Sequence, residues 1–200
     1  MKEKMELDVW SGDWGLPSVD FSCLQVMLYC RFSGVPIKFN YTNNPWWSST
    51  GTLPLFKQSN HRLSKFQDVV SHLKSQNYSA DLNLSPKDSG DVNAYSALLK
   101  EQLEPAIEYL FWIDERNYNE IIRPWFAEKL GFPFNYFLPN RIKKKAEKLI
   151  KNRFGIQVNN IETIQVIETA VHSEAQKCLT LLSERLNNNE FFFGKNPSSF

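Results

Sequence analysis

The sequence of 200 residues has few of the features that mark disulfide-rich, membrane-spanning or strongly charged proteins. Its cysteines, Cys23, Cys30 and Cys178, are odd in number and form no C-x-x-C pair, which fits neither a disulfide framework nor a zinc ribbon and favours a reducing compartment. No uninterrupted apolar run reaches the roughly 18 residues that a membrane-spanning helix needs. With 23 basic and 22 acidic residues the net charge is +1, so the overall charge favours neither nucleic acid nor an anionic membrane as a partner.

Sequence motifs for metal, phosphate and nucleotide binding are also missing. His61, His72 and His172 lie outside any H-E-x-x-H pattern, and neither a P-loop nor G-x-G-x-x-G occurs. Ser11 and Ser18 lie near the expected start of the first helix, where backbone N–H groups could activate a nucleophile or hold an anion, but no base stands at a fixed spacing. We therefore expect Ser11 to form a turn and Ser18 to cap the helix, and we expect no metal and no cofactor.

What the sequence does have, with 42% hydrophobic residues, is the composition of a globular chain that can bury a core. Its first part alternates between strand and helix patterns, and Ser64 is placed to cap the second helix. Cys23 and Cys30 are expected as buried small hydrophobes on the first helix. The expected strands are 5–10, 36–41, 53–57 and 61–63, and the expected helices are 17–34, ending at Gly34, and 64–77.

The second part of the chain is helical throughout. A polar stretch over residues 78–90 predicts a linker, and helices are expected over 91–114, 117–130, 141–153 and 161–186. Pro105 and Pro124 should disturb the first two of these helices, and residues 131–140 should interrupt the pattern. The predicted fold class is therefore α/β plus all-α, with an α/β domain over 1–77, a linker over 78–90 and a helical domain over 91–200.

Basic residues concentrate in residues 141–153, which carry a net charge of +6 against −5 for the rest of the chain. Apolar residues line one side of this helix, so that it can dock on the protein and present its charges outward. Two interpretations stand: a solvated helix face, or contact with anionic lipid headgroups. Nucleic acid is disfavoured because aromatic residues are not interleaved with the charges. The candidates for an anionic surface are Arg141, Lys143, Lys144, Lys145, Lys148 and Lys151.

Aromatic residues crowd into residues 109–137, where ten of 29 positions are Phe, Trp or Tyr. Such a density is typical of a hydrophobic core, and equally of a protein interface with aromatic anchors. Both interpretations remain open, for different residues. The candidates for partner binding are Trp112, Trp125, Phe126, Phe134 and Phe137.

Several stretches along the whole chain resemble the metaxins. The longest is the run from Trp10 to Asp20, with the sequence WSGDWGLPSVD. Further resemblances are Asn44-Pro45-Trp46, Gly51-Thr52-Leu53-Pro54, Tyr78-Ser79-Ala80-Asp81, Phe111-Trp112-Ile113-Asp114, residues 132–139 (FPFNYFLP), residues 178–183 (CLTLLS) and Phe191-Phe192-Phe193-Gly194.

Metaxins resemble glutathione S-transferases, which have a thioredoxin-like N-terminal domain and a helical second domain. The resemblance implies a cis peptide bond before Pro54, and it makes Ser11, Pro54 and Ser64 vestigial positions of a glutathione site. Transferases hold glutathione with an acidic residue followed by Ser, whereas this chain has Leu63-Ser64. That departure argues against glutathione binding, and a glutathione-dependent transferase or peroxidase using Ser11 or Ser18 is the alternative.

The resemblance further implies a protein of the mitochondrial outer membrane that faces the cytosol. It implies pairing with a second metaxin and work with the sorting and assembly machinery that inserts β-barrel proteins. Family members are also implicated as adaptors between mitochondria and motor proteins. None of these roles requires chemistry on a substrate, so the expectation is a non-enzymatic scaffold.

The end of the chain looks like the lead-in to a further helix, which Ser198 would cap. On the resemblance we expect that helices and a C-terminal membrane anchor belong beyond Phe200. The helical domain should then expose apolar surface, and we expect self-association through residues 161–186 or 109–137.

Overall fold

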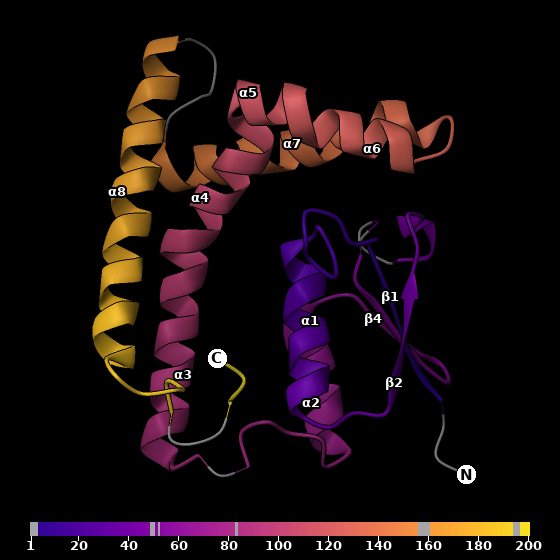
Figure 1. The fold of residues 1–200 in the computed structure, drawn as a ribbon, viewed down its shortest axis with the longest axis vertical. Coiled ribbons are helices and arrows are strands. Elements are labelled where there is room, and N and C mark those ends of the chain that lie inside the picture. Colours follow the sequence, from indigo (N-terminus) through magenta and orange to yellow (C-terminus); the bar gives the residue numbers. More distant parts are fainter. Residues whose placement is uncertain (1–3, 49–50, 52, 83, 156–160, 194–196) are drawn as a thin grey trace. The chain divides into compact units, whose positions relative to one another are not determined.

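A computed structural model describes residues 4–48, 51, 53–82, 84–155, 161–193 and 197–200 (Figure 1). Two compact units make up the chain: Met1–Ser85 with Phe193–Ser199, and Pro86–Phe192 with Phe200. We call them unit 1 and unit 2. Some residues on which sequence expectations were placed lie outside the described ranges, namely Thr52, Asn83, Gly194, Lys195 and Asn196.

Unit 1 contains a four-stranded mixed sheet in the order β2-β1-β3-β4, built from the four strands that the sequence predicts. Strand β1 pairs in parallel with β2 and antiparallel with β3, which in turn pairs antiparallel with β4. Because the parallel pair needs a crossover, a helix connects β1 to β2. The elements are β1 (Met5–Val9), α1 (Phe21–Phe32), β2 (Ile37–Tyr41), the short helix η1 (Pro45–Trp47), β3 (Leu55–Gln58), β4 (His61–Leu63) and α2 (Phe66–Ser75).

The core of unit 1 follows from the alternation along β1. Met5, Leu7 and Val9 are buried, whereas the intervening Glu6 and Asp8 point to the opposite face of the sheet. Cys23 and Cys30, on the buried side of α1, are 0% exposed, which confirms that they act as small hydrophobes.

The helix ends of unit 1 correct two expected caps. The N-cap of α1 is Asp20, whose carboxylate accepts a hydrogen bond from the backbone N–H of Cys23 at 2.8 Å, so Ser18 is not the cap. The N-cap of α2 is Lys65 and has no side-chain hydrogen bond, so Ser64 is not a cap either. Gly34 follows α1 with φ of 65°, which confirms its place just past the helix end.

The C-terminal segment of unit 1 is fixed to Asp81. The backbone N–H of Ser199 donates to Asp81 Oδ1 at 2.7 Å, and Lys74 Nζ lies 2.8 Å from Asp81 Oδ2. Burial would raise the pKa of Asp81, but the hydrogen bonds from Lys74 and Ser199 outweigh it and lower that pKa. The carboxylate is therefore held in its charged form between two elements distant in sequence.

Unit 2 is helical, and two of its helices begin earlier than expected. The first begins at Pro86 rather than near Asp91, since proline suits the first turn of a helix. The basic helix begins at Phe134 rather than Arg141 and continues through Pro139, its sixth residue, where the missing N–H removes one hydrogen bond within the helix. The elements are α3 (Pro86–Leu98), η2 (Leu99–Leu103), α4 (Glu104–Glu108), η3 (Tyr109–Ile113), α5 (Glu115–Asn117), η4 (Tyr118–Ile122), α6 (Arg123–Lys129), α7 (Phe134–Phe154) and α8 (Ile161–Leu186).

The disturbance expected at Pro105 and Pro124 takes the form of π-helical turns. The π-helical segment η2 ends two residues before Pro105, and η4 likewise ends two residues before Pro124. Proline lacks the N–H that would bond four residues back, and a wider turn is one way for a helix to accommodate that loss. The helical path is thus continuous from Pro86 to Ile113, with changes of helix type along it.

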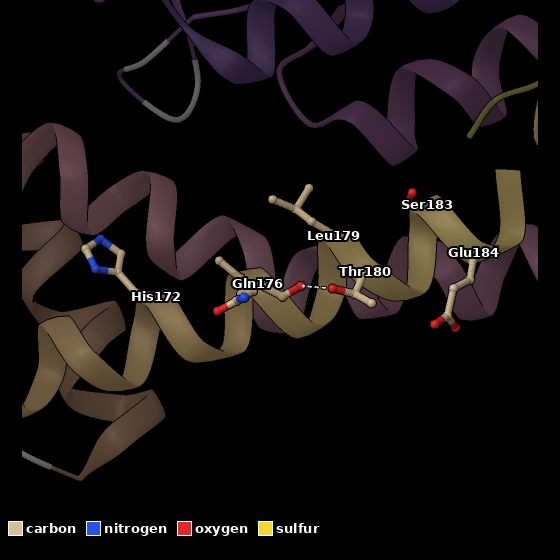
Figure 2. A pocket seen from close by; sticks show the side chains of 7 residues that line it. His172, Gln176, Leu179, Thr180, Ser183 and Glu184 are labelled. Carbon is tan, nitrogen blue, oxygen red and sulfur yellow. Dashed lines mark hydrogen bonds between the residues drawn. The ribbon is translucent and has the colours of Figure 1, made fainter. Parts of the chain in front are cut away.

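One side of α8 is open and shallowly hollowed, with a volume of about 520 Å³ (Figure 2). All the residues that line this hollow come from α8, and the side chain of Leu179 is 54% exposed. The hollow is therefore the exposed side of one helix and not a cleft formed by several elements. Its lining residues are His172, Ala175, Gln176, Leu179, Thr180, Ser183 and Glu184.

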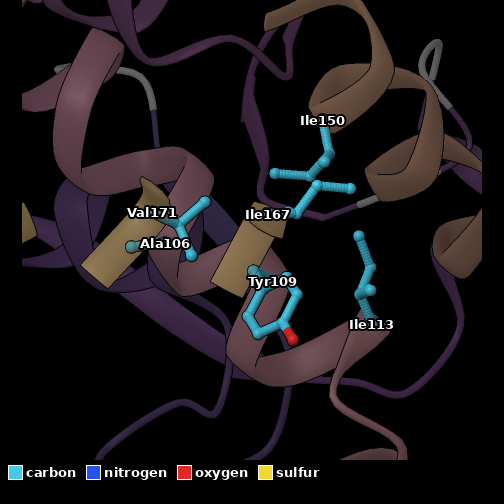
Figure 3. Close-up of a cluster of buried hydrophobic side chains, with 6 residues drawn as sticks. All are labelled: Ala106, Tyr109, Ile113, Ile150, Ile167 and Val171. Carbon is cyan, nitrogen blue, oxygen red and sulfur yellow. The ribbon is translucent and has the colours of Figure 1, made fainter. Parts of the chain in front are cut away.

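An adjoining side of α8 enters the core of unit 2 (Figure 3). Ile167 and Val171 of α8 pack with Ile150 of α7 and with two buried residues that follow Pro105, Ala106 and Tyr109. Ile113 completes the cluster, and Leu149, Phe154 and Ala175 pack against it. Burying the apolar side of α7 in this way directs its basic side outward, as the sequence predicts.

Candidate functional site

The two serines of the transferase alternative, Ser11 and Ser18, form hydrogen bonds within the chain. Ser11, in the loop after β1, donates from Oγ to Asn43 Oδ1 at 2.9 Å. Ser18 is 0% exposed, and its Oγ accepts from the backbone N–H of Asp20 at 3.4 Å. Both hydroxyls therefore hold the loops around α1 together, and these bonds join them to an amide oxygen and a backbone N–H rather than to a general base.

The other two vestigial positions are Pro54 and Ser64. The peptide bond from Leu53 to Pro54 is cis, which confirms the expectation for Pro54. Ser64 Oγ lies 2.8 Å from Ser48 Oγ, so a residue of the loop after β2 engages the hydroxyl that a transferase would offer to glutathione. Ser48 is itself buried. The sequence offered no signal for this contact, because it joins residues 16 apart through a loop.

The cysteines of unit 1 have the properties of inert thiols. Cys23 lies in the first turn of α1, where a helix N-terminus can favour a thiolate, but burial and the nearby Asp20 carboxylate raise its pKa well above the usual value. Burial raises the pKa of Cys30 to about 12. Neither thiol is therefore poised for nucleophilic chemistry at neutral pH.

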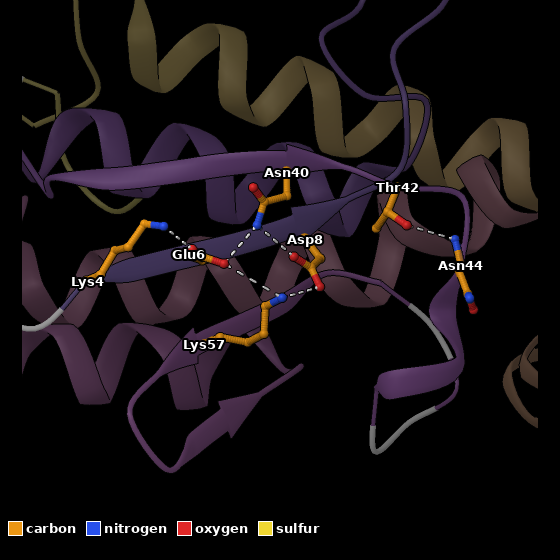
Figure 4. A network of polar contacts seen from close by, with 7 residues as sticks. All are labelled: Lys4, Glu6, Asp8, Asn40, Thr42, Asn44 and Lys57. Carbon is orange, nitrogen blue, oxygen red and sulfur yellow. Dashed lines mark hydrogen bonds and ion pairs between the residues drawn. The ribbon is translucent and has the colours of Figure 1, made fainter.

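The polar face of the sheet carries a network of ion pairs and hydrogen bonds (Figure 4). Lys57 Nζ lies 2.7 Å from Asp8 Oδ2, and Asn40 donates to both Asp8 and Glu6 at 3.1 Å. Hydrogen bonds from Lys4 and then from Asn40 lower the pKa of Glu6. The carboxylates of Glu6 and Asp8 are thus satisfied by Lys4, Lys57 and Asn40 within the chain.

Two histidines that are separate in the sequence meet in unit 1. The ring centroids of His61 on β4 and His72 on α2 are 4.7 Å apart, and His72 Nε2 lies 2.8 Å from Gln58 Oε1. Burial, and then the neighbouring His61, lower the pKa of His72. Across the described part of the chain, no group of three or more His, Cys, Asp or Glu side chains is arranged to hold a metal ion.

Most of the aromatic partner candidates are core residues. Trp112, Trp125 and Phe126 are each at most 8% exposed, and the Phe126 ring centroid lies 5.4 Å from that of Trp112 and 5.0 Å from that of Trp125. Of the two interpretations that the sequence leaves open for these three residues, their burial supports the core of unit 2, where η3 and α6 pack the rings together. Phe134 is half-buried, and only Phe137, at 69% exposed, remains openly accessible.

Two aromatic residues outside that set of candidates join Phe137 at the surface. Phe132 is 82% exposed and Tyr136 is 64% exposed, and their rings meet edge to face at 6.2 Å. The three rings project from the turn before α7 and from its first helical turn. Their position next to a basic helix was visible in the sequence, but their exposure depends on the early start of α7.

The anionic-surface candidates all lie on α7. Arg141, Lys144, Lys145, Lys148 and Lys151 are exposed. Lys143 differs from them, because it is partly covered and its Nζ lies 4.4 Å from the centroid of the Tyr118 ring. Among the residues that the structure describes, no ion pair is formed by the five exposed cations.

A comparison with protein families identifies this architecture. The family model for Tom37, the outer mitochondrial membrane transport complex protein, matches residues 23–143, more than half of the chain. The chain belongs to this family. Its members include the metaxins, so the resemblance drawn from the sequence motifs is confirmed.

Individual metaxins match over the whole sequence. Metaxin-1 of Mus musculus is 42% identical over 200 residues, which cover 100% of this chain and 62% of the mouse protein. Metaxin-3 of Xenopus laevis is 37% identical over 196 residues, covering 98% of this chain and 62% of its own length. The chain thus spans less than two thirds of the length of these relatives.

Among solved structures, a glutathione S-transferase of Ceriporiopsis subvermispora in complex with glutathione is similar in fold. The TM-score is 0.53 at 13% identity, covering 100% of this chain and 83% of the transferase. This likeness supports the expected fold class, a thioredoxin-like domain followed by a helical transferase-like domain, and says nothing of activity. In the described ranges, no helix is both long and apolar enough to cross a bilayer.

Proposed function

We propose that this metaxin-family chain is a non-enzymatic scaffold of the mitochondrial outer membrane, facing the cytosol. It pairs with a second metaxin and acts in the sorting and assembly machinery that inserts β-barrel proteins. The observation that carries the proposal is the match of residues 23–143 to an outer mitochondrial membrane transport complex protein. An additional role as an adaptor for mitochondrial transport by motor proteins stays a prediction from the resemblance.

The arrangement of the transferase positions supports a role without catalysis. Ser11 is bonded to Asn43, and Ser64 is engaged by Ser48 and preceded by Leu63 in place of an acidic residue. A glutathione molecule would have to displace the Ser48 contact and would find no carboxylate for its γ-glutamyl amine. Buried groups left without partners oppose binding, so the transferase alternative is disfavoured.

Affinity isolation of the unmodified chain and of one double variant tests the proposal. Tagged chain, isolated from detergent-solubilised outer membranes, should retain the second metaxin and the β-barrel assembly proteins. The variant Ser11→Ala/Ser64→Ala should retain them equally, because neither hydroxyl serves chemistry. Failure of the unmodified chain to retain either partner would overturn the proposal.

Glutathione titration by calorimetry tests the alternative directly. The scaffold account predicts no binding heat with the unmodified chain. Micromolar binding that is lost in Ser64→Ala and kept in the matched surface variant Ser75→Ala would instead support a glutathione-dependent enzyme. Ser75 suits the control because it is an exposed residue of the same unit, at the far end of α2.

A further inference from the structure

The solvent side of α7 presents one aromatic residue and a row of cations in line. Phe137, Arg141, Lys144, Lys148 and Lys151 follow one another at spacings of four, three, four and three residues, which places them on one side of a helix. The row extends for roughly 21 Å along the axis. All five side chains are exposed, and the opposite side of the helix is buried in the core of unit 2.

The aromatic end of this row is enlarged by Phe132 and Tyr136. Exposed Phe and Tyr rings at one end of a cationic surface match the two zones of a bilayer, where rings lie at the headgroup level and cations face anionic lipid. We propose that this surface, comprising the three rings and the cationic row, docks on an anionic lipid bilayer. The rings enter the headgroup region while the cations contact lipid phosphates and carboxylates.

The composition of the surface favours a bilayer over a protein or a nucleic acid. Three of the four cations in the row are lysines, and lysine is depleted in protein interfaces, where arginine is preferred. Within the described ranges, these four cations form no ion pair with a carboxylate of the chain, so their side chains are not fixed in one geometry. Such side chains suit anionic lipid headgroups, which move laterally in the bilayer. The rings precede the cations rather than alternating with them, unlike a surface on which nucleic-acid bases stack.

The proposal does not rely on partner pairing, and it gives Phe137, a candidate for partner binding, a different contact. Each cation near an anionic membrane contributes about fivefold to the partition constant, so three cations contribute about a hundredfold. Raising the salt from about 0.1 M to about 1 M shortens the screening length from about 10 to about 3 Å and should weaken binding strongly.

The test is flotation of the 200-residue chain with vesicles of phosphatidylcholine and phosphatidylserine in equal parts. Binding should fall about a hundredfold in Lys144→Gln/Lys148→Gln/Lys151→Gln and about tenfold in Phe137→Ser. It should change little in the matched control Lys87→Gln/Lys100→Gln/Lys177→Gln, which removes the same charge from exposed positions of unit 2. Binding to vesicles of phosphatidylcholine alone should be weak.

Several outcomes would overturn the proposal. One is equal loss in the two triple variants, which would mean that only net charge matters. Another is binding to soluble polyglutamate without binding to vesicles, which would indicate an acidic protein partner. A third is loss of the second metaxin in Phe137→Ser with vesicle binding intact, and this result would leave the proposed scaffold role standing.

Discussion

The packing of Ile150 sets how firmly the basic helix α7 is held, and Ile150→Ala tests it. Ile150 is 0% exposed and lies in the buried cluster with Ile167, Val171 and Tyr109. The substitution removes three buried carbons, worth about 2.4 kcal/mol of transfer free energy at about 0.8 kcal/mol each. The cavity that remains should raise the loss in the free energy of unfolding to about 3–4 kcal/mol.

The assay is urea and thermal unfolding followed by far-UV circular dichroism. Ile150→Ala should lower the melting temperature by roughly 10 °C, whereas Ile150→Val should cost about 1 kcal/mol. Leu181→Ala is the matched control, since Leu181 is 47% exposed on α8 and its truncation should change stability by less than about 0.5 kcal/mol. If Ile150→Ala loses no more than Leu181→Ala, the cluster is not the core of unit 2 and the reasoning is refuted.

Three further predictions concern titration and association. Because burial lowers the pKa of His72, the unfolded chain binds a proton at a higher pH than the folded chain does. The free energy of unfolding of unit 1 should therefore fall between about pH 7 and about pH 5. In urea titrations, His72→Asn should reduce this pH dependence and the control His172→Asn should leave it unchanged. The pKa of Asp81 is lowered in the folded chain, so its carboxylate stabilises the fold above the unfolded pKa of about 4, and this stabilisation is lost as the pH falls through the folded pKa. Asp81→Asn should therefore reduce the free energy of unfolding by about 1–2 kcal/mol at pH 7 and leave it unchanged at acid pH. An equal reduction at both pH values would contradict this. The apolar side chains exposed on α8 should cause self-association that Leu179→Ser/Leu181→Ser reduces, and light scattering that finds only monomer at high concentration would contradict it.

Features governed by local periodicity could be predicted from the sequence. The alternation along β1, the burial of Cys23 and Cys30 on α1, and the outward basic side of α7 all follow from residue spacing. Helix ends were harder, because Ser64 has the chemistry of a cap yet Lys65 takes that place. Pro139 indicated a break, yet α7 continues through it, because packing of the helix against its neighbours outweighs the loss of one hydrogen bond.

Contacts between distant segments could not be predicted in this way. Nothing in local pattern places Ser48 against Ser64, or His61 against His72, since both contacts depend on how loops and strands return to one another. The aromatic residues show the same limit. Trp112 is buried and Phe137 is exposed, because Trp112 lies on a side of its helix that faces neighbouring helices and Phe137 does not. Composition alone does not determine which side of a helix faces its neighbours.

The most direct test of the scaffold account is the assembly of a labelled β-barrel precursor into the outer membrane of mitochondria that lack this protein. The account predicts that assembly falls without the protein and that Ser11→Ala/Ser64→Ala, verified as folded by its melting temperature, restores it as fully as the unmodified protein. Undiminished assembly in its absence, or failure of the folded variant to restore assembly, would contradict the central claim.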